Sequence, residues 1–279
     1  MAGFKVSVVM PTFRQPGVLL LTLQDLAAQD YPCDLWELVV LDDGSRDISA
    51  LLAVAGFRDD VALTVRREAN NSSYSHSALF NRLLSLSDEA ASVIVHVEDA
   101  RLPMDYISQH VKWHGGSELR LVTGPMCESA CVTFDPAFCS RWELMRSGGE
   151  SDAYICSFQA IFAKSMSYSK ALALALNESG SHEVFDERMT GWGYHETEFA
   201  YRALRAGAEC IYDVKCGVYH PAHDSYDEER YRAIMRPEVR KLGERQNIQY
   251  LCEKHNLARL PEWGYGIPVP SPELPALEG

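Results

Sequence analysis

Short apolar runs alternate with amphipathic stretches over the first third of the chain. The runs are rich in β-branched residues, which is typical of strands buried on both faces of a sheet. They are FKVSVVM, WELVVLDD, VALTVRRE and ASVIVHVEDA. The stretches between them carry leucines at helical spacing and are VLLLTLQDLAAQ, ISALLAVAG and SALFNRLLSLSD. This alternation predicts an α/β fold with a doubly wound, mostly parallel sheet flanked by helices. The first strand, Phe4 to Met10, is expected to end at Pro11.

The second half of the chain is less regular. Strands are expected at RLVTGPM, in FQAIFAKSMSYSKALAL before a helix, and at AECIYDV, which an ordered loop at GVYHPAH follows. Residues 226–255 show a strongly charged helical pattern, and the last twenty or so residues hold five of the 13 prolines. No repeat and no clear linker interrupts the pattern. We therefore expect one domain over residues 1–258 and a Pro-rich C-terminal tail over residues 259–279.

Composition and charge limit the kinds of ligand that the protein is expected to bind. The 279 residues are 47% hydrophobic and 23% charged, which is enough to bury a sizeable core. The formal net charge of -13 argues against nucleic acid as a partner, because a nucleic-acid surface needs clustered Lys and Arg to displace counterions. A nucleotide ligand stays open, since a metal ion and backbone N–H groups can hold one diphosphate at any global charge.

The sequence contains no apolar run long enough to span a bilayer, and MAGFKVSVVMPTF lacks the features of a secretory signal. The expected location is therefore cytoplasmic. The eight cysteines form no CxxC pair and are expected to be reduced. Cys127, Cys131 and Cys139 are the closest cluster, and small core residues are favoured there over a zinc site, which would need closer pairs.

Two acidic pairs follow predicted strands. Asp42 and Asp43 end the second strand, and Glu98 and Asp99 end the fourth. Each pair taken alone could simply cap a turn. The carboxyl ends of parallel strands meet at one edge of a doubly wound sheet, where ligands bind. Together the two pairs favour a site that faces water or shares a cation.

At this point the chain resembles a known family. The stretch VSVVMPTFRQPGVLLLTLQDLAAQDYPCDLWELVVLDDGSRD looks like the opening of family 2 nucleotide-sugar glycosyltransferases of the GT-A fold. The resemblance continues through HVEDARLP and GWGYHETE to the YHPAH loop, and so covers roughly residues 4–255. It implies a Rossmann-like GT-A fold with a nucleotide-binding half at about residues 1–115. An irregular acceptor-binding half would follow at about residues 116–258.

The resemblance implies a nucleotide pocket at the ends of the first two strands. The second aspartate of the DDGS turn, Asp43, would hydrogen-bond the uracil or ribose of the donor. Pro11, Thr12 and Phe13 would line the same pocket.

The family's Ala-Arg-Asn triplet, which contacts the nucleotide, is not preserved. Leu79 and Phe80 stand in place of Ala and Arg, and only Asn81 is retained. Arg66 or Arg82 could supply the missing charge, but both could equally be surface residues.

The family's D-x-D motif, which holds a divalent cation on the donor diphosphate, is represented by Glu98, Asp99 and Ala100. The third acid is missing, which leaves Asp99 as the expected metal ligand and Glu98 as the second acid. Mn²⁺ and Mg²⁺ remain the expected cofactors, because they often bind through one or two carboxylates plus substrate phosphate. Arg101 could partly replace the cation by touching the diphosphate directly.

A histidine downstream of the GWG helix completes the metal sphere in related enzymes. His220 in YHPAH matches that position best, and His223 is the other candidate in the same loop. An imidazole beside a carboxylate would suit Mn²⁺ better than Mg²⁺.

The GWGYHETE motif is expected to form the acceptor side of the site. Aligned by GWG, Glu196 stands where the family has the aspartate that acts as general base, and His195 stands where it has a glutamate that binds the acceptor. Trp192 offers a flat apolar face for a sugar ring, and Gly193 lets a sugar approach the backbone. The alternative is a packed GWG turn followed by a helix-capping first turn, in which His195 only caps.

These features predict an inverting glycosyltransferase that moves a sugar from a nucleotide diphosphate, expected to be UDP, to an acceptor hydroxyl. The acceptor would be a carbohydrate or a small molecule. The alternative is a non-catalytic nucleotide-sugar or carbohydrate-binding protein that kept the fold; a retaining transferase is a third possibility. The sequence leaves the sugar, the linkage and the oligomeric state open.

Overall fold

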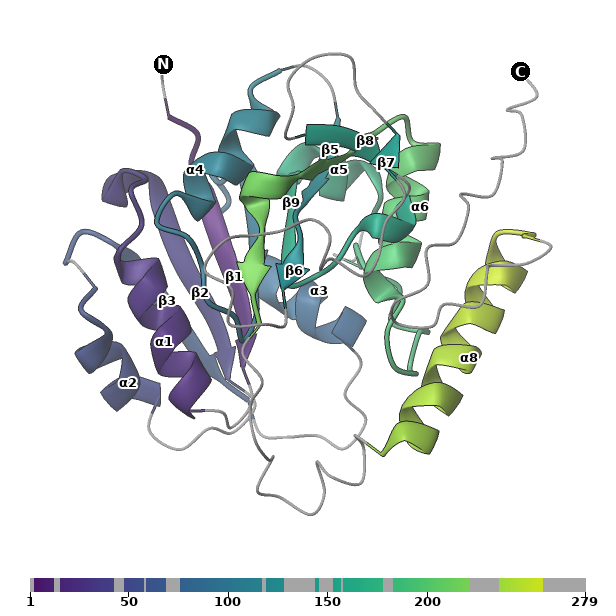
Figure 1. Cartoon of the computed structure of the whole chain (residues 1–279), viewed down its shortest axis with the longest axis horizontal. Helices are drawn as coiled ribbons and strands as arrows, with labels where there is room; N and C mark the ends of the chain where they lie inside the picture. Colours follow the sequence, from purple (N-terminus) through teal and green to yellow (C-terminus); the bar gives the residue numbers. More distant parts are fainter. Residues whose placement is uncertain are drawn as a thin grey trace.

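The computed structural model describes most of the chain. The described residues are 3–12, 16–42, 48–57, 59–68, 76–116, 119–127, 144–145, 153–156, 158–177, 183–220 and 236–257. Their main feature is a nine-stranded sheet with the order β3-β2-β1-β4-β9-β5-β10-β8-β7 (Figure 1). Its strands are β1 (Val6–Thr12), β2 (Trp36–Asp42), β3 (Ala62–Arg67), β4 (Val93–Val97), β5 (Arg120–Thr123), β7 (Leu144–Met145), β8 (Ala153–Cys156), β9 (Ser165–Ser169) and β10 (Glu209–Asp213).

Helices cover both faces of this sheet, as the alternating pattern predicts. They are α1 (Pro16–Ala27), α2 (Ile48–Ala55), α3 (His76–Leu86), α4 (Tyr106–Val111), α5 (Lys170–Ala175), α6 (His195–Arg205) and α8 (Pro237–Lys254). Short 3-10 helices lie at 33–35, 112–114, 158–160 and 214–216. A second, two-stranded sheet pairs β6 (Met126–Cys127) with β11 (Val218–Tyr219).

Two hydrophobic cores lie on opposite faces of the sheet, because successive side chains of a strand point to opposite sides. Val6, Val8 and Met10 of β1 pack with buried residues of α1, α2 and α4. Val9, from the same strand, packs with residues of α3, α5 and α6 on the other face. The predicted α/β class and the helices on both faces are therefore confirmed.

The four N-terminal strands are parallel, so their carboxyl ends share one edge. β1 pairs with both β2 and β4 in parallel register, with Thr12 opposite Asp42. The expected end of the first strand at Pro11 is wrong, because β1 continues to Thr12. The pairing of β1 with β4 ends at Val9, so no hydrogen bond to β4 requires the backbone N–H that Pro11 lacks.

Strand β9 breaks the parallel pattern at the centre of the sheet. It lies between β4 and β5 and runs antiparallel to both, with Ser165 opposite Val97. In this sheet only β9 and β8 run against the other described strands. The antiparallel direction brings the first residue of β9 to the last residue of β4. The segment just before β9 is thereby placed beside the acids that follow β4.

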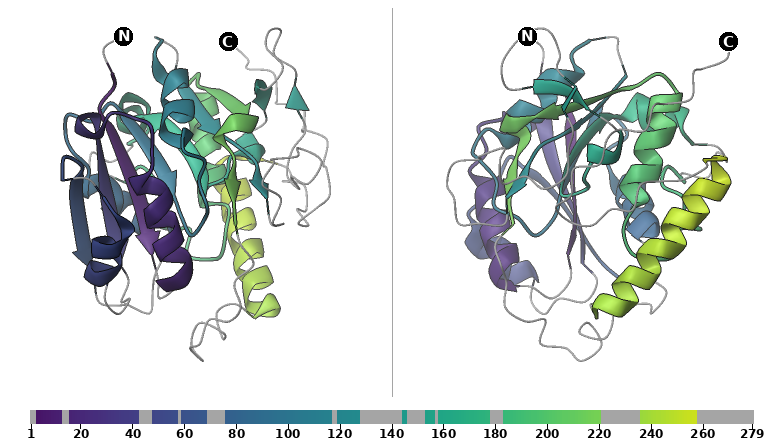
Figure 2. Two further views of the ribbon diagram at one scale, coloured as in Figure 1. Left: turned by 60° about the vertical axis from the view of Figure 1, so that its left-hand side comes forward. Right: turned by 45° about the vertical axis from the view of Figure 1, so that its right-hand side comes forward.

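Helix α8 packs against α6. Figure 2 shows α8 alongside α6, on the side of the molecule away from α1 and α2. Lys254 and His255 at the end of α8 reach the buried carboxylate of Glu198 in α6, at 2.8 and 2.9 Å. The helix expected over 226–255 is found as α8, which begins at Pro237. The predicted tail, residues 259–279, lies outside the described residues.

None of the helices in the described part of the chain is both long and apolar enough to cross a membrane.

Candidate active site

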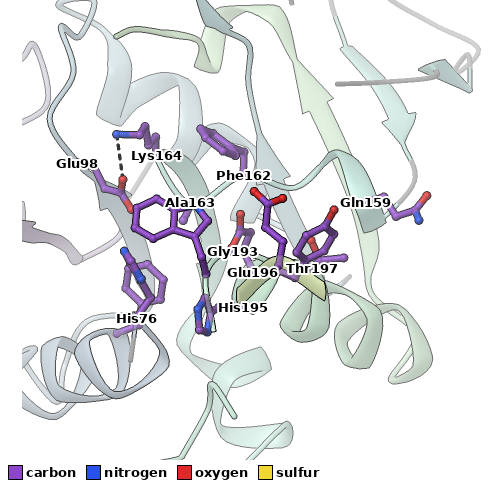
Figure 3. A pocket seen from close by; sticks show the side chains of 14 residues that line it. His76, Glu98, Gln159, Phe162, Ala163, Lys164, Gly193, His195, Glu196 and Thr197 are labelled. Atoms are coloured by element: carbon purple, nitrogen blue, oxygen red, sulfur yellow. Dashed lines mark ion pairs between the residues drawn. The ribbon is translucent and has the colours of Figure 1, made fainter. Parts of the chain in front are cut away.

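A pocket opens where the carboxyl end of β4 meets the start of α6 (Figure 3). Its walls come from α3, the end of β4, the segment before β9, the GWG turn with the start of α6, and one residue of α8. The lining residues are His76, Phe80, Glu98, Gln159, Phe162, Ala163, Lys164, Trp192, Gly193, Tyr194, His195, Glu196, Thr197 and Glu244. The pocket therefore brings together the acids after β4 and the GWGYHE motif, which are almost a hundred positions apart in the sequence.

Lys164 forms an ion pair with both acids of the second acidic pair. Its ammonium lies 3.2 Å from Glu98 Oε2 (Figure 3) and is closer still to Asp99 Oδ1. Burial opposes the positive charge, but the two carboxylates outweigh it and raise the pKa of Lys164 above its ordinary value. The sequence reasoning missed this residue. The available signal was a single charged residue within an otherwise uncharged segment, FQAIFAKSMSYS.

His220 lies on the other side of Asp99. Its Nε2 is 3.4 Å from Asp99 Oδ2. An antiparallel backbone bridge between Arg101 and Tyr219, with N–O distances of 2.7 and 3.0 Å, aligns the two segments and so sets His220 beside the acid. The predicted pairing of Asp99 with a downstream histidine is thus present as a contact.

The donor atoms at this place suit a hard divalent cation in kind, because carboxylate oxygen and imidazole are ligands that Mn²⁺ accepts. No cluster of three or more His, Cys, Asp or Glu placed to hold a metal ion occurs in the described ranges. Among the described residues, protein groups therefore do not complete a coordination sphere there, and phosphate oxygens would supply further ligands. A metal held by Asp99 and His220 stays a prediction.

The Arg101 side chain is held away from the pocket lining. Its guanidinium makes two hydrogen bonds to the carboxylate of Asp25 in α1, at 2.5 and 2.8 Å. This contact raises the pKa of Arg101. Contact between Arg101 and a diphosphate stays a prediction.

The GWG turn owes its shape to α8 and to two left-handed residues. Gly193 and Tyr194 have φ values of 70° and 66° and turn the chain into α6. A Cβ on Gly191 would lie 2.2 Å from the carbonyl oxygen of Gly243 in α8, so only glycine fits there. Asn247 of α8 binds the turn at both ends, accepting from Gly191 N at 3.0 Å and donating to Gly193 O at 2.7 Å.

The two glycines therefore have different roles. Gly191 is required for packing, as the alternative interpretation of the motif proposed. Gly193 lines the pocket, and a Cβ there would meet nothing within 4 Å. Its surroundings leave the space that an approaching sugar would need.

His195 is buried and uses both ring nitrogens within the protein. Nε2 is 3.2 Å from Gly191 O, and Nδ1 is 2.8 Å from Ser77 Oγ in α3. A carbonyl can only accept, so Nε2 carries the proton and Nδ1 accepts from the Ser77 hydroxyl. Burial lowers the pKa of His195 to about 3, and the ring is neutral. Binding an acceptor through either nitrogen would require one of these bonds to break.

Glu196 occupies the first turn of α6, where the positive end of the helix dipole favours a carboxylate. The residue is 8% exposed, and its side chain lines the pocket. In Figure 3 the carboxylate extends from α6 toward Phe162, on the same side of the pocket as Lys164. The predicted base and Glu98 therefore lie on one cavity.

Trp192 is held between the side chains of His76 and Arg240. The ring of His76 in α3 meets it edge-on at 5.4 Å, and the guanidinium of Arg240 in α8 lies 4.9 Å from its centroid. Burial lowers the pKa of His76. The indole is therefore positioned by elements on both sides of the GWG turn.

The predicted nucleotide-binding residues are described only in part. Pro11 and Thr12 end β1, half-buried, beside the end of β2. They are not among the residues that line the pocket. Phe13 and Asp43 lie outside the described residues, as does His223.

Asn81, the residue retained from the family triplet, makes hydrogen bonds to the backbone within the protein. Its side chain donates to Phe185 O and accepts from Phe185 N, both at 2.8 Å. Arg82 pairs at 2.7 Å with Glu68 on the exposed surface. Phe80 replaces the family's arginine and lines the pocket with an apolar ring.

Comparison with known proteins agrees with this geometry. Residues 7–114 match the family model described as glycosyl transferase family 2. No curated protein sequence matches the chain significantly.

Solved structures share the fold over most of the chain. A mannosyltransferase from Pyrobaculum calidifontis, in complex with GDP-Man and Mn²⁺, is 17% identical with a TM-score of 0.59, covering 92% of this chain and 73% of its own. TarS from S. aureus is 16% identical with a TM-score of 0.56, covering 92% of this chain and 44% of its own, so this chain spans less than half of TarS. A shorter TarS structure with UDP-GlcNAc is 18% identical with a TM-score of 0.57, covering 89% of this chain and 67% of its own.

The sheet order, the pocket at the carboxyl edge and the family match lead to one assignment: the chain is a glycosyltransferase with the GT-A fold, and its residues 7–114 match the model of glycosyl transferase family 2.

Proposed function

We propose that the protein is an inverting glycosyltransferase that moves a sugar from a nucleotide diphosphate, UDP in the first instance, to a hydroxyl of a carbohydrate or small-molecule acceptor. The observation that carries this proposal is that Glu196, at the start of α6, and Glu98, at the end of β4, line the same pocket. A single displacement requires a base and, in the same cavity, charged groups where the diphosphate binds.

Glu196 is the general base of the proposed reaction. Its carboxylate takes the proton of the acceptor hydroxyl while the hydroxyl oxygen forms a bond to the anomeric carbon of the donor sugar. The bond from that carbon to the diphosphate oxygen breaks, and the electron pair leaves with the diphosphate. Attack opposite the leaving group inverts the anomeric centre. Trp192 and Gly193 provide the surface on which the acceptor sugar lies.

Negative charge builds on the departing diphosphate, so the site has to supply positive charge there. In the proposed site, Asp99 and His220 would hold a divalent cation, Mn²⁺ in the first instance, together with phosphate oxygens of the donor, and the cation would supply that positive charge. The ammonium of Lys164, which pairs with Glu98 and Asp99, is a second source of positive charge. The nucleotide itself lies toward the ends of β1 and β2, where Pro11, Thr12, Phe13 and Asp43 are the proposed contacts.

Release of UDP or GDP from a panel of nucleotide sugars, measured with Mn²⁺ and with candidate acceptors, tests the function. Glu196→Gln removes the basic carboxylate and keeps the size of the side chain. We expect it to lower kcat by about 10² or more, because general-base catalysis contributes on that scale, while nucleotide affinity stays unchanged.

Glu209→Gln serves as the matched control, since Glu209 pairs with Arg120 on β5 and is absent from the pocket lining. It should leave kcat unchanged. Full activity of Glu196→Gln would overturn the assigned base. Tight nucleotide-sugar binding without turnover, across all donors and acceptors, would instead favour a non-catalytic binding protein. Retention of the anomeric configuration would exclude the single displacement.

A further inference from the structure

Lys164 places a protein-borne cation on the acids that are expected to hold a divalent one. The ammonium bridges Glu98 and Asp99, and the Lys164 side chain is only 18% exposed. Two carboxylates face a single ammonium in this cluster. The three groups together therefore keep a net charge of minus one.

The fold fixes this lysine in place. Residues 162–165 form a turn in which Ser165 N donates to Phe162 O at 3.1 Å, and β9 follows immediately. Ser165 is paired with Val97, the last residue of β4, so Lys164 must lie beside the acids that follow. Ala163 and Ser165, on either side of Lys164, are buried. The contact thus follows from strand pairing and does not depend on a chance surface rotamer.

The charges of this cluster disfavour the binding of a divalent cation alone and of a diphosphate alone. A divalent cation arriving alone meets the ammonium on the same carboxylate oxygens, and like charges at hydrogen-bond distance repel strongly in a partly buried site. A diphosphate arriving alone meets two carboxylates and one ammonium, which leave an excess of negative charge. When both ligands arrive, the carboxylates can hold the cation while the ammonium turns to the phosphates.

The chemistry of the lysine side chain permits such a change of partner. An ammonium has three N–H donors, and Glu98 and Asp99 are its ion-pair partners among the described residues. Four flexible methylene groups let the charge move by a few ångströms without backbone movement. Lys164 also lines the pocket, so its ammonium is close to the place that the proposed function gives to the diphosphate.

We propose that Lys164 occupies the cation position of the acid pair in the nucleotide-free protein and changes its contact to the diphosphate when nucleotide and divalent cation bind together. The lysine thereby makes cation binding depend on nucleotide. This inference rests on the proposed function, since it needs a nucleoside diphosphate as the second ligand.

Three variants test the proposal by equilibrium binding. Lys164→Gln removes the charge and keeps a hydrogen-bond donor, whereas Lys164→Arg keeps the charge. Lys5→Met is the matched control, because Lys5 pairs with Asp88 and precedes the amino end of β1, at the edge of the sheet opposite the site. The probes are MnCl₂ alone, UDP or GDP alone, and each nucleotide with MnCl₂. The free Mn²⁺ signal in electron paramagnetic resonance and isothermal titration calorimetry provide the affinities.

For Lys164→Gln, we expect binding of Mn²⁺ alone to tighten by about tenfold or more, because the competing charge is gone. Binding of the nucleotide in the presence of Mn²⁺ should weaken by about tenfold, because a charge-assisted contact to phosphate is lost. Lys164→Arg and Lys5→Met should bind Mn²⁺ alone as the wild type does. The opposite signs of the two effects distinguish this role from a merely structural one.

The wild-type protein gives a test that needs no variant. Mn²⁺ should bind at least about tenfold more tightly in the presence of saturating nucleotide than alone, and by linkage the nucleotide should gain the same factor from Mn²⁺. Equal Mn²⁺ affinities with and without bound nucleotide would overturn the proposal, as would unchanged or weaker binding of Mn²⁺ alone by Lys164→Gln. Failure of UDP and GDP to bind under any condition would instead count against the proposed function.

Discussion

Ser77 and His195 illustrate how residues at the pocket are fixed by buried hydrogen bonds. The Ser77 hydroxyl donates to His195 Nδ1, and His195 Nε2–H donates to Gly191 O. These two hydrogen bonds join α3, the GWG turn and the start of α6, and the side chains of Ser77 and His195 are buried. An unpaired buried nitrogen costs free energy, so each link holds the next in one orientation.

Removing the Ser77 hydroxyl tests this role. Ser77→Ala leaves Nδ1 of a buried, neutral imidazole without its donor, and we expect the free energy of unfolding to fall by about 1–3 kcal/mol. Ser85→Ala, on the exposed side of the same helix, should cost less than about 0.5 kcal/mol. Urea unfolding of both variants provides the comparison. Equal stability of the two would show that the Ser77 bond contributes nothing.

The roles of single residues were the hardest part to predict from the sequence. Trp192, Gly193, His195 and Glu196, which the motif singled out, line one pocket. The motif could not show that His195 has both nitrogens occupied, because Ser77 is 118 positions away in the chain. Partners so distant in sequence are set by the packing of α3 on the sheet, which no local pattern records.

At the scale of elements, α8 acts as the support of the GWG turn. Gly243 of α8 and Gly191 of the turn pack backbone to backbone, and Asn247 binds the turn on both sides. Arg240, one turn earlier in α8, lies over Trp192. A change in α8 should therefore be felt on the acceptor side of the pocket and not at the acids after β4.

Gly243→Ala tests this separation. The new Cβ would lie 2.5 Å from Trp192 N, so the turn has to shift away from α8. We expect KM for the acceptor to rise by about tenfold or more, with the affinity for nucleotide and Mn²⁺ unchanged. Steady-state kinetics and calorimetry provide the two measurements.

Gly17→Ala is the matched control, since a Cβ at that position in α1 meets nothing within 4 Å. It should leave both constants unchanged and should not lower stability, because alanine favours a helix over glycine. An unchanged acceptor KM in Gly243→Ala would refute the supporting role of α8.

The elements of the N-terminal half were predictable because each carries its own signal. Buried β-branched runs and helical leucine spacing located β1, β2, β3 and β4 and the helices between them to within a few residues. The position of β9 was not predictable, since its sequence, SMSYS, reads as a strand of either direction. Its neighbours β4 and β5 decide the direction, and with it the place of Lys164.

At the scale of the whole molecule, four buried histidines tie stability to pH. Burial lowers the pKa of His96, His110 and His195 to about 3 and that of His114 to about 4. In the unfolded chain these groups have pKa values of roughly 6.5. The unfolded state therefore binds protons that the folded state does not as the pH falls below about 6.5. Stability must decrease on acidification in that range.

We expect the free energy of unfolding to fall by several kcal/mol between pH 6.5 and pH 5, up to roughly 6 if all four histidines stay neutral in the native state. Urea unfolding across this range at constant ionic strength measures it. His114→Gln removes one of these protonation sites. It should therefore reduce the slope of the free energy of unfolding against pH by about 1.4 kcal/mol per pH unit. A free energy that stays flat from pH 6.5 to 5 would contradict the neutral histidines.

The central position of β9 has a consequence for how the chain is made. The residues that complete the middle of the sheet are synthesised long after β4; His96 meets Tyr168, 72 positions later. A nascent chain that has emerged only as far as α4 therefore exposes one unpaired, apolar side of β4 to other polypeptides. Until β9 leaves the ribosome, one edge of β4 in the N-terminal half has no neighbouring strand. We expect a chaperone to matter most at this stage of synthesis.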